Sequence, residues 1–297
     1  MKSIGFLNSG SPTPFIRYLE VFRQGLEDTG HVEGQNVEII QRWAEGDYDA
    51  LDRQAIELVD RGVDLIAATG GIVSAQAAIR ATDTIPIVFL GGVDPFQVQF
   101  VNGTFGPPPN ATGVDTSTTD SVPERLARLR KLVPNLTKIA TLLRPGTFVF
   151  EREKEQATKA SLEIVEASDD SEYEPAFALA VKNGADALIV CADPSFTNSR
   201  KKLVALAKQY KLPTASSFRA FPEDGGFMSF GPSLRKAYRQ VGENCGKILN
   251  GVEPSEMPVQ VIPISDFEEV VNDNTARELG LQLTEEQLKG AQTIDCN

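Results

Sequence analysis

Two aspartates are well placed to bind a ligand through their charge. Asp193 follows the apolar segment 185–192, and Asp94 follows the apolar segment 85–90 after a short glycine turn. Either carboxylate can accept hydrogen bonds from an ammonium group or from sugar hydroxyls. In open α/β sheets, ligands bind beyond the carboxyl ends of the strands, where both aspartates are expected. This pattern predicts a site for a small molecule.

Two small polar loops suit an anionic group. Residues 9–11 (Ser-Gly-Ser) and 69–71 (Thr-Gly-Gly) each come directly before an expected helix. Free backbone N–H groups at a helix start, together with hydroxyl groups and the helix dipole, can hold a carboxylate or another anion. The alternative is that the hydroxyl groups only cap the helices.

Phenylalanines recur near the same strand ends and could form an apolar cage for a planar ligand. Ordinary core packing is the alternative for each ring. The complete set of predicted ligand-binding residues is Ser9, Gly10, Ser11, Thr69, Gly70, Ser74, Gly92, Asp94, Thr116, Ser117, Phe148, Phe150, Asp193, Ser195, Phe196, Phe218 and Phe230.

The sequence lacks the common catalytic motifs. Its one histidine, His31, follows Gly30 in an expected surface turn, and a single histidine cannot support a metal cluster. No Gly-x-Ser-x-Gly elbow is present, and no Gly-x-Gly-x-x-Gly follows a strand. Segment 242–248 resembles a phosphate-binding loop, but it is one residue short and lacks Ser or Thr after Lys247. We therefore predict no catalytic residue, no metal site and no cofactor.

Other charged and sulfur-containing residues have ordinary explanations. Glu151, Glu153 and Glu155 alternate with basic residues on an expected helix, which predicts a solvated helix face. The three cysteines are far apart in the sequence and lack the close pairing of zinc or redox motifs.

Chain length and net charge further narrow the possible classes of protein. The chain has 297 residues, of which 41% are hydrophobic, and single cores usually stop growing at about 250–300 residues, which favours two lobes. The net charge of −12 argues against a nucleic-acid partner. No apolar run approaches the roughly 20 residues that cross a bilayer.

The elements expected to position these residues are short buried strands that alternate with helices. A proline-rich connector at 106–110 separates two such series. Continuous apolar strands separated by helices are typical of a parallel sheet that is covered on both faces. The predicted fold class is α/β, with two doubly wound parallel-sheet lobes. The expected strands are 3–7, 37–41, 63–68 and 85–90, followed by 138–143, 161–167, 185–192 and 225–231.

A series of motifs resembles the family of ABC-transporter substrate-binding proteins that includes tryptophan-binding members. Each motif alone is weak, but their order and spacing are specific. They are FLNSGSP (6–12), FRQGL (22–26), VEGQNV (32–37), RWAEG (42–46), IPIVF (85–89), ADP (192–194), GGFMSFGPS (225–233) and ILNG (248–251).

The resemblance implies a type I periplasmic-binding fold with two lobes joined by a three-stranded hinge. The chain would cross near Asp115, Gly231 and Val259. The expected amino-terminal lobe is 1–115 plus 231–258, and the expected carboxyl-terminal lobe is 116–230 plus 259–297. Such lobes close around a solute that contacts both of them.

The resemblance also implies a receptor that passes a small polar solute to a cognate ABC permease. The solute is expected to be an amino acid or an aromatic amino-acid-like compound. The protein is expected to be a monomer in the periplasm or another extracytoplasmic location, with its leader removed ahead of Ser3. Two alternatives stay open: a ligand-sensing domain of the same fold, and a small-molecule enzyme that uses carboxylates such as Asp193 with a Lys or Arg partner.

Overall fold

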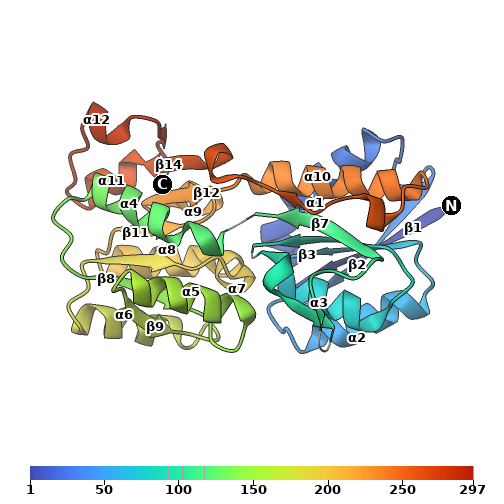
Figure 1. Cartoon of the computed structure of the whole chain (residues 1–297). Helices are drawn as coiled ribbons and strands as arrows, with labels where there is room; N and C mark the ends of the chain where they lie inside the picture. The colour runs from blue at the N-terminus through green and yellow to red at the C-terminus, as the bar shows by residue number, and fades with distance from the viewer. Residues whose placement is uncertain (93, 102–103, 117, 297) are drawn as a thin grey trace. The chain divides into compact units, whose positions relative to one another are not determined.

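The computed structural model describes residues 1–92, 94–101, 104–116 and 118–296 (Figure 1). The chain divides into two compact units. Unit 1 consists of Met1–Ser117 and Leu234–Ile262, and unit 2 consists of Thr118–Ser233 and Pro263–Asn297. The chain therefore passes from one unit to the other three times.

Unit 1 contains a six-stranded sheet in the order β13-β7-β4-β3-β1-β2, and its described strand pairs are all parallel. Parallel neighbours need crossover connections, which the intervening helices provide. The central strands are buried along their whole length, as expected for a sheet covered on both faces. The bounds are β1 Lys2–Asn8, β2 Val37–Trp43, β3 Leu65–Thr69, β4 Ile87–Gly91, β7 Ala111–Asp115 and β13 Gln260–Val261.

Four helices of the described part of unit 1 cover this sheet. Helices α1 (Pro12–Glu27) and α10 (Leu234–Leu249) lie together on one face, and α2 (Ala50–Asp60) and α3 (Ile72–Ala81) cover the other (Figure 1). Shorter elements are the 3-10 turns at Pro95–Gln97 and Pro254–Glu256 and the hairpin of β5 (Gln99–Val101) and β6 (Thr104–Phe105).

Helices α1 and α10 approach each other closely at Gly242. A Cβ atom at this position would lie only 2.1 Å from the carbonyl oxygen of Phe22, so only glycine fits. The segment that resembled a phosphate-binding loop therefore belongs to a packed helix. Its apolar side chains recur at helical spacing, and Tyr238, Val241 and Cys245 are fully buried.

Unit 2 contains a seven-stranded sheet in the order β15-β14-β12-β11-β10-β8-β9. Its described pairs are parallel except for β12 with β14, which is antiparallel. The bounds are β8 Ile139–Leu143, β9 Glu163–Glu166, β10 Ala187–Val190, β11 Thr214–Ser216, β12 Met228–Gly231, β14 Glu268–Asn272 and β15 Gln292–Ile294.

The helices of unit 2 also form two layers. Buried side chains of α6 and α8 share one hydrophobic core, and those of α4 and α11 share another. The bounds are α4 Val122–Leu132, α5 Phe148–Lys159, α6 Tyr173–Lys182, α7 Pro194–Asn198, α8 Arg200–Gln209, α9 Ala220–Glu223, α11 Asp273–Glu278 and α12 Glu285–Leu288, with 3-10 turns at Thr119–Ser121 and Ile264–Asp266.

Each unit has a topological switch point, where successive connections leave in opposite directions along the sheet. It lies between β1 and β3 in unit 1, and between β8 and β10 in unit 2. Ligands of open α/β sheets bind outside the carboxyl ends of the strands at such points. The predicted fold class of two doubly wound, mainly parallel sheets is confirmed.

Candidate ligand-binding site

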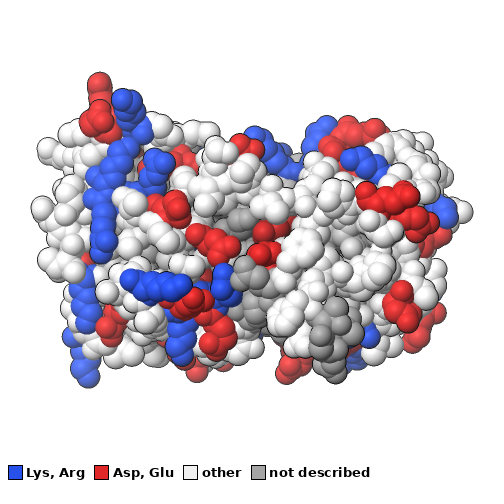
Figure 2. All heavy atoms as spheres, in the orientation of Figure 1, with Lys and Arg blue, Asp and Glu red and all other residues white. Residues whose placement is uncertain are grey.

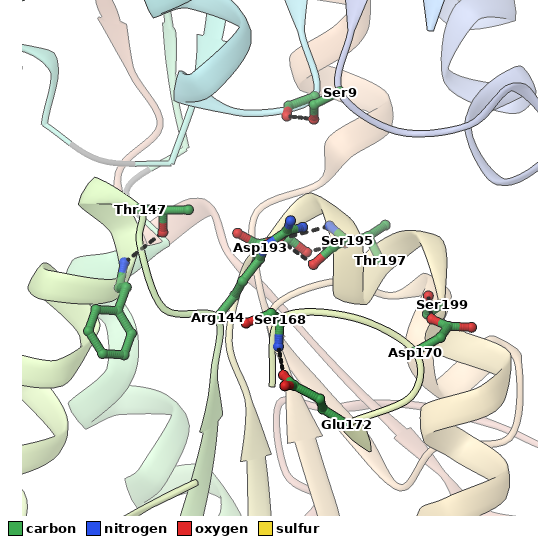
Figure 3. A network of polar contacts seen from close by, with 12 residues as sticks. Ser9, Arg144, Thr147, Ser168, Asp170, Glu172, Asp193, Ser195, Thr197 and Ser199 are labelled. Atoms are coloured by element: carbon green, nitrogen blue, oxygen red, sulfur yellow. Dashed lines mark hydrogen bonds and ion pairs between the residues drawn. The ribbon is translucent and has the colours of Figure 1, made fainter. Parts of the chain in front are cut away.

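Asp193 is a buried cap at the carboxyl end of β10. The residue is only 1% exposed. Its Oδ1 accepts hydrogen bonds from the backbone N–H of Ser195 at 2.9 Å and from the Ser195 hydroxyl at 2.6 Å (Figure 3). Asp193 therefore shapes the turn into α7 as well as placing a negative charge at this edge.

Arg144 lies opposite Asp193 across the switch point of unit 2. One guanidinium nitrogen of Arg144, the first residue after β8, is 3.9 Å from Oδ1 of Asp193, and Figure 3 shows the two side chains pointing toward each other. The Arg144 side chain is 16% exposed, and that of Asp193 is 2% exposed. The set of predicted binding residues did not include Arg144. Its position directly after the first strand of the unit was the signal that could have identified it.

Neighbouring loops at the same edge are held by side-chain hydrogen bonds. The hydroxyl of Thr147 accepts from the backbone N–H of Phe150 at 3.1 Å and caps α5. The carboxylate of Glu172 accepts from the backbone N–H of Ser168 at 2.6 Å, and the Ser199 hydroxyl donates to Asp170 at 2.7 Å (Figure 3). These contacts fix the loops that surround Arg144 and Asp193.

Glu153 is buried, which corrects the prediction of a solvated face. It is 1% exposed, whereas Glu151 and Glu155 are exposed. Positions two residues apart on a helix point to nearly opposite sides, so alternating glutamates cannot share one face. One carboxylate oxygen of Glu153 accepts from the backbone N–H of Ala192 at 3.3 Å. Burial raises its pKa to about 7, although Arg125 and this hydrogen bond act to lower it.

At the switch point of unit 1, Asn8 and Thr69 are direct neighbours in the β1–β3 register. The Asn8 amide donates to the Thr69 hydroxyl at 2.9 Å and to the Tyr238 hydroxyl at 3.1 Å. The Asn8 side-chain oxygen accepts from the backbone N–H of Gly10 at 2.7 Å. The Ser9 hydroxyl donates to the carbonyl of Gly70 (Figure 3). The polar loops predicted from the sequence are therefore joined by hydrogen bonds in this unit.

Three buried hydroxyl groups, those of Ser74, Ser217 and Ser229, lack a hydrogen-bond partner among the described residues, and the first two lie at a carboxyl edge of a sheet. Ser74 is fully buried in the first turn of α3, which begins after Gly71 at a left-handed φ of 96°. Ser217 is 2% exposed at the carboxyl end of β11. A buried hydroxyl without a partner is costly, so such groups are candidates for bonding a ligand or a water molecule. Ser74 was among the predicted residues, and Ser217 was not.

Other predicted residues of unit 1 have structural roles. Asp94 accepts from the backbone N–H of Phe96 at 3.0 Å and caps a 3-10 turn beyond β4. The Thr116 hydroxyl donates to the carbonyl of Gly91 at 2.8 Å. Gly92 lies directly after β4, and Ser11 is the N-cap residue of α1 without a side-chain capping hydrogen bond. Ser117 lies outside the described residues.

Three of the five phenylalanines predicted to form a cage pack into the hydrophobic cores of unit 2. Phe150 and Phe196 belong to one hydrophobic core of unit 2, and Phe230 belongs to another, where its ring centroid is 5.6 Å from that of Phe267. Packing against protein side chains accounts for these rings. Phe218 is half-buried, and the Phe148 side chain is outside what the structure describes.

A small pocket of about 20 Å³ in unit 2 lies at the carboxyl ends of β10 and β11. Its lining includes Phe196, Thr197, Arg200, Ser217 and Phe218. A second, apolar pocket of about 270 Å³ lies near the amino ends of β11 and β12 and is therefore away from the ligand edge of the sheet.

The face of the molecule in Figure 2 carries both acidic and basic side chains. Apart from one narrow column of basic side chains on unit 2, Figure 2 shows acidic and basic groups interspersed. Within the described ranges, no cluster of His, Cys, Asp and Glu could hold a metal ion. No described helix is both long and apolar enough to cross a membrane.

Comparisons with known proteins identify the family. The family described as ABC transporter substrate binding protein matches residues 17–294. The tyrosine-binding protein of Clostridioides difficile (strain R20291) is 27% identical over 267 residues, which cover 88% of this chain and 76% of that protein.

Solved structures share the fold. A conserved domain protein from Vibrio cholerae has a TM-score of 0.85 at 23% identity, and the match covers 98% of this chain and 99% of that one. The ABC domain from Streptococcus pneumonia in complex with L-Trp has a TM-score of 0.82 at 24% identity, with the same coverage. Because the family match spans nearly the whole sequence, this chain belongs to the ABC transporter substrate-binding protein family, as its sequence motifs indicated.

Proposed function

We propose that this protein is the solute receptor of an ABC importer and that its solute is an aromatic amino acid, bound without chemical turnover. The tyrosine-binding relative and the L-Trp complex of a structural neighbour support this class of solute. The receptor would act as a monomer outside the cytoplasm and would deliver the solute to its cognate ABC permease.

The pairing of Arg144 with Asp193 carries the proposal. A free amino acid presents a carboxylate and an ammonium group a few bonds apart. The Arg144 guanidinium can bind a carboxylate through two parallel N–H···O bonds, and Asp193 can accept from the ammonium group. The 3.9 Å separation is longer than the 2.7–2.9 Å of a close charge-assisted hydrogen bond, so a solute can interact with both charges at small cost.

The aromatic part of the solute needs apolar surface with some polar groups. The pocket beside Phe218 in unit 2 supplies an apolar wall, and the Ser217 hydroxyl supplies a polar group without a partner among the described residues. In unit 1, we propose further contacts from Ser9, Thr69 and Ser74 at the carboxyl edge of its sheet. We also propose solute contacts at this edge from the other predicted residues of unit 1. They are Gly10, Ser11, Gly70, Gly92, Asp94, Thr116 and Ser117.

A calorimetric binding screen tests this function. L-tyrosine, L-tryptophan and L-phenylalanine are titrated into the protein at pH 8, with L-lysine, L-glutamate and myo-inositol as controls. We expect at least one aromatic amino acid to bind at one-to-one stoichiometry and to raise the melting temperature, because a ligand that binds only the folded state stabilises it. Binding confined to inositol or to charged amino acids would overturn the proposed solute class.

A further inference from the structure

Glu153 makes a direct contact with the loop that carries Asp193. Its side chain extends from α5 into the interior of unit 2, and its carboxylate accepts from the backbone N–H of Ala192 at 3.3 Å. Ala192 precedes Asp193, whose carboxylate in turn holds Ser195. The position of the Asp193 charge therefore depends on a chain of contacts that begins at Glu153.

The charged and titratable groups that face Glu153 come from two other segments. Arg125 on α4 is fully buried, and Cys191 and Asp193 follow β10. The Arg125 guanidinium donates to the carbonyl of Phe230 at 3.3 Å and to the carbonyl of Thr118 at 3.2 Å. A third bond, at 3.0 Å, goes to the hydroxyl of Ser121 on the turn before α4.

The ionised carboxylate of Glu153 has two effects on the groups around it. It is a stronger acceptor for the Ala192 N–H than a neutral carboxyl group, because hydrogen bonds to charged acceptors are stronger. It also compensates the buried positive charge of Arg125, which would otherwise be costly. Protonation of Glu153 weakens both effects and leaves the 191–195 loop less firmly held.

We propose that Glu153 is a positioning residue, whose ionised carboxylate holds the 191–195 loop in the conformation that binds solute, so that protonation of Glu153 lowers solute affinity. The proposal rests on the proposed function, because it concerns the same edge of unit 2.

The environment of Glu153 brings the protonation of its carboxylate close to neutral pH. Burial raises the pKa of Glu153 to about 7, with Asp193 adding to the rise, and Arg125, the Ala192 N–H and Cys191 oppose it. A glutamate with an ordinary pKa would stay ionised from pH 6 to pH 8 and would give no effect in this range. The ammonium and carboxylate groups of a free amino acid do not titrate there either.

The first experiment measures the dissociation constant of L-tyrosine by calorimetry at pH 6, 7 and 8. If only the ionised form binds, the constant rises about tenfold from pH 8 to pH 6, in proportion to the loss of the competent form. The Glu153→Gln variant should bind weakly with the same constant at all three pH values. The control variant Glu155→Gln changes an exposed glutamate on the same helix and should keep the wild-type profile. A flat wild-type profile, or a Glu153→Gln variant that keeps the tenfold change, would overturn the proposal.

A second measurement needs neither a solute nor a variant. Nuclear magnetic resonance should show the amide resonances of Ala192 and Asp193 in the unliganded protein shifting with a midpoint near pH 7. If L-tyrosine fails to bind at every pH while these amides titrate, the proposed solute is wrong but the linkage of Glu153 to the loop stands. Amides that do not respond between pH 6 and pH 8 would overturn the linkage itself.

Discussion

Arg144 and Asp193 form an ion pair with a separation of 3.9 Å at the switch point between β8 and β10. Asn8 and Thr69 occupy the corresponding place between β1 and β3 in unit 1, where they form a neutral hydrogen bond of 2.9 Å. The two units thus repeat one topology but differ in charge at the position where open sheets bind ligands. For this reason we propose that the charged groups of the solute bind in unit 2.

Replacing Asp193 should affect both binding and stability. The Asp193→Ala variant should lose solute binding, because it removes the proposed partner of the solute's ammonium group. Because Asp193 also caps α7, we expect the variant to lose about 1 kcal/mol of unfolding free energy as well. Urea denaturation and calorimetry measure the two effects. Thr284→Ala, which removes the cap of α12, is the control that should lose stability but bind normally.

Arg144→Met should weaken solute binding without unfolding the protein. A hydrogen bond to a charged group contributes about 1.5–3 kcal/mol, which corresponds to a roughly 10- to 150-fold rise in the dissociation constant. Arg144→Lys should recover only part of the affinity, because lysine keeps the charge but not the bidentate geometry. Arg152→Met removes an arginine that pairs with Asp120 and Glu155 elsewhere in unit 2 and should bind like wild type. Equal affinities for the two methionine variants would exclude Arg144 from the site.

Glu153 should make the unliganded protein less stable as the pH rises. Its folded pKa of about 7 lies above the ordinary value of 4.5, so the folded state holds a proton that the unfolded state releases. The stabilisation by this bound proton is fully present below about pH 4.5. As the pH rises through 7, up to about 3 kcal/mol of unfolding free energy is lost.

Urea denaturation between pH 5 and pH 8 measures this loss. Glu153→Gln should remove the part of the pH slope that Glu153 causes, whereas Glu155→Gln should retain the wild-type slope. Identical slopes for wild type and Glu153→Gln would show that Glu153 titrates at its ordinary pKa. The trend is opposite to that predicted for solute affinity, which should strengthen with rising pH.

The close contact of α1 with α10 predicts the result of Gly242→Ala. Alanine favours a helix by about 1 kcal/mol relative to glycine, but its Cβ would lie 2.1 Å from the Phe22 carbonyl oxygen. Overpacking of this kind costs about 1–3 kcal/mol, so we expect a net loss of stability by thermal denaturation. Lys236→Ala, on the exposed side of the same helix, should change stability by less than about 0.5 kcal/mol. A stabilised Gly242→Ala variant would contradict the packing described for unit 1.

The fold was predictable because its signals are local and repeated. Apolar strands, polar loops and amphipathic helices alternate along the chain, and glycines such as Gly30 and Gly62 end helices at left-handed φ angles. The exception is β14, which runs antiparallel to β12. The apolar pattern of a strand does not show whether it pairs in the parallel or the antiparallel direction.

The site was only partly predictable, because the sequence does not show which side chains face each other. Asp193 and Ser195 were predicted from their place after a strand, and the structure shows that they contact each other directly. Arg144 and Ser217 were missed, because an arginine or a serine in a loop is usually exposed to solvent. The role of Phe196 depends on three-dimensional packing, and so does the burial of Glu153.

The most direct test of the central claim compares L-tyrosine with two analogues that each lack one charge. Tyramine has no carboxylate for Arg144, and 3-(4-hydroxyphenyl)propionate has no ammonium group for Asp193. Calorimetry on the wild-type protein at pH 8 should show tight binding of L-tyrosine and at least tenfold weaker binding of both analogues. Equal affinities for all three compounds would contradict recognition of a zwitterion by Arg144 and Asp193.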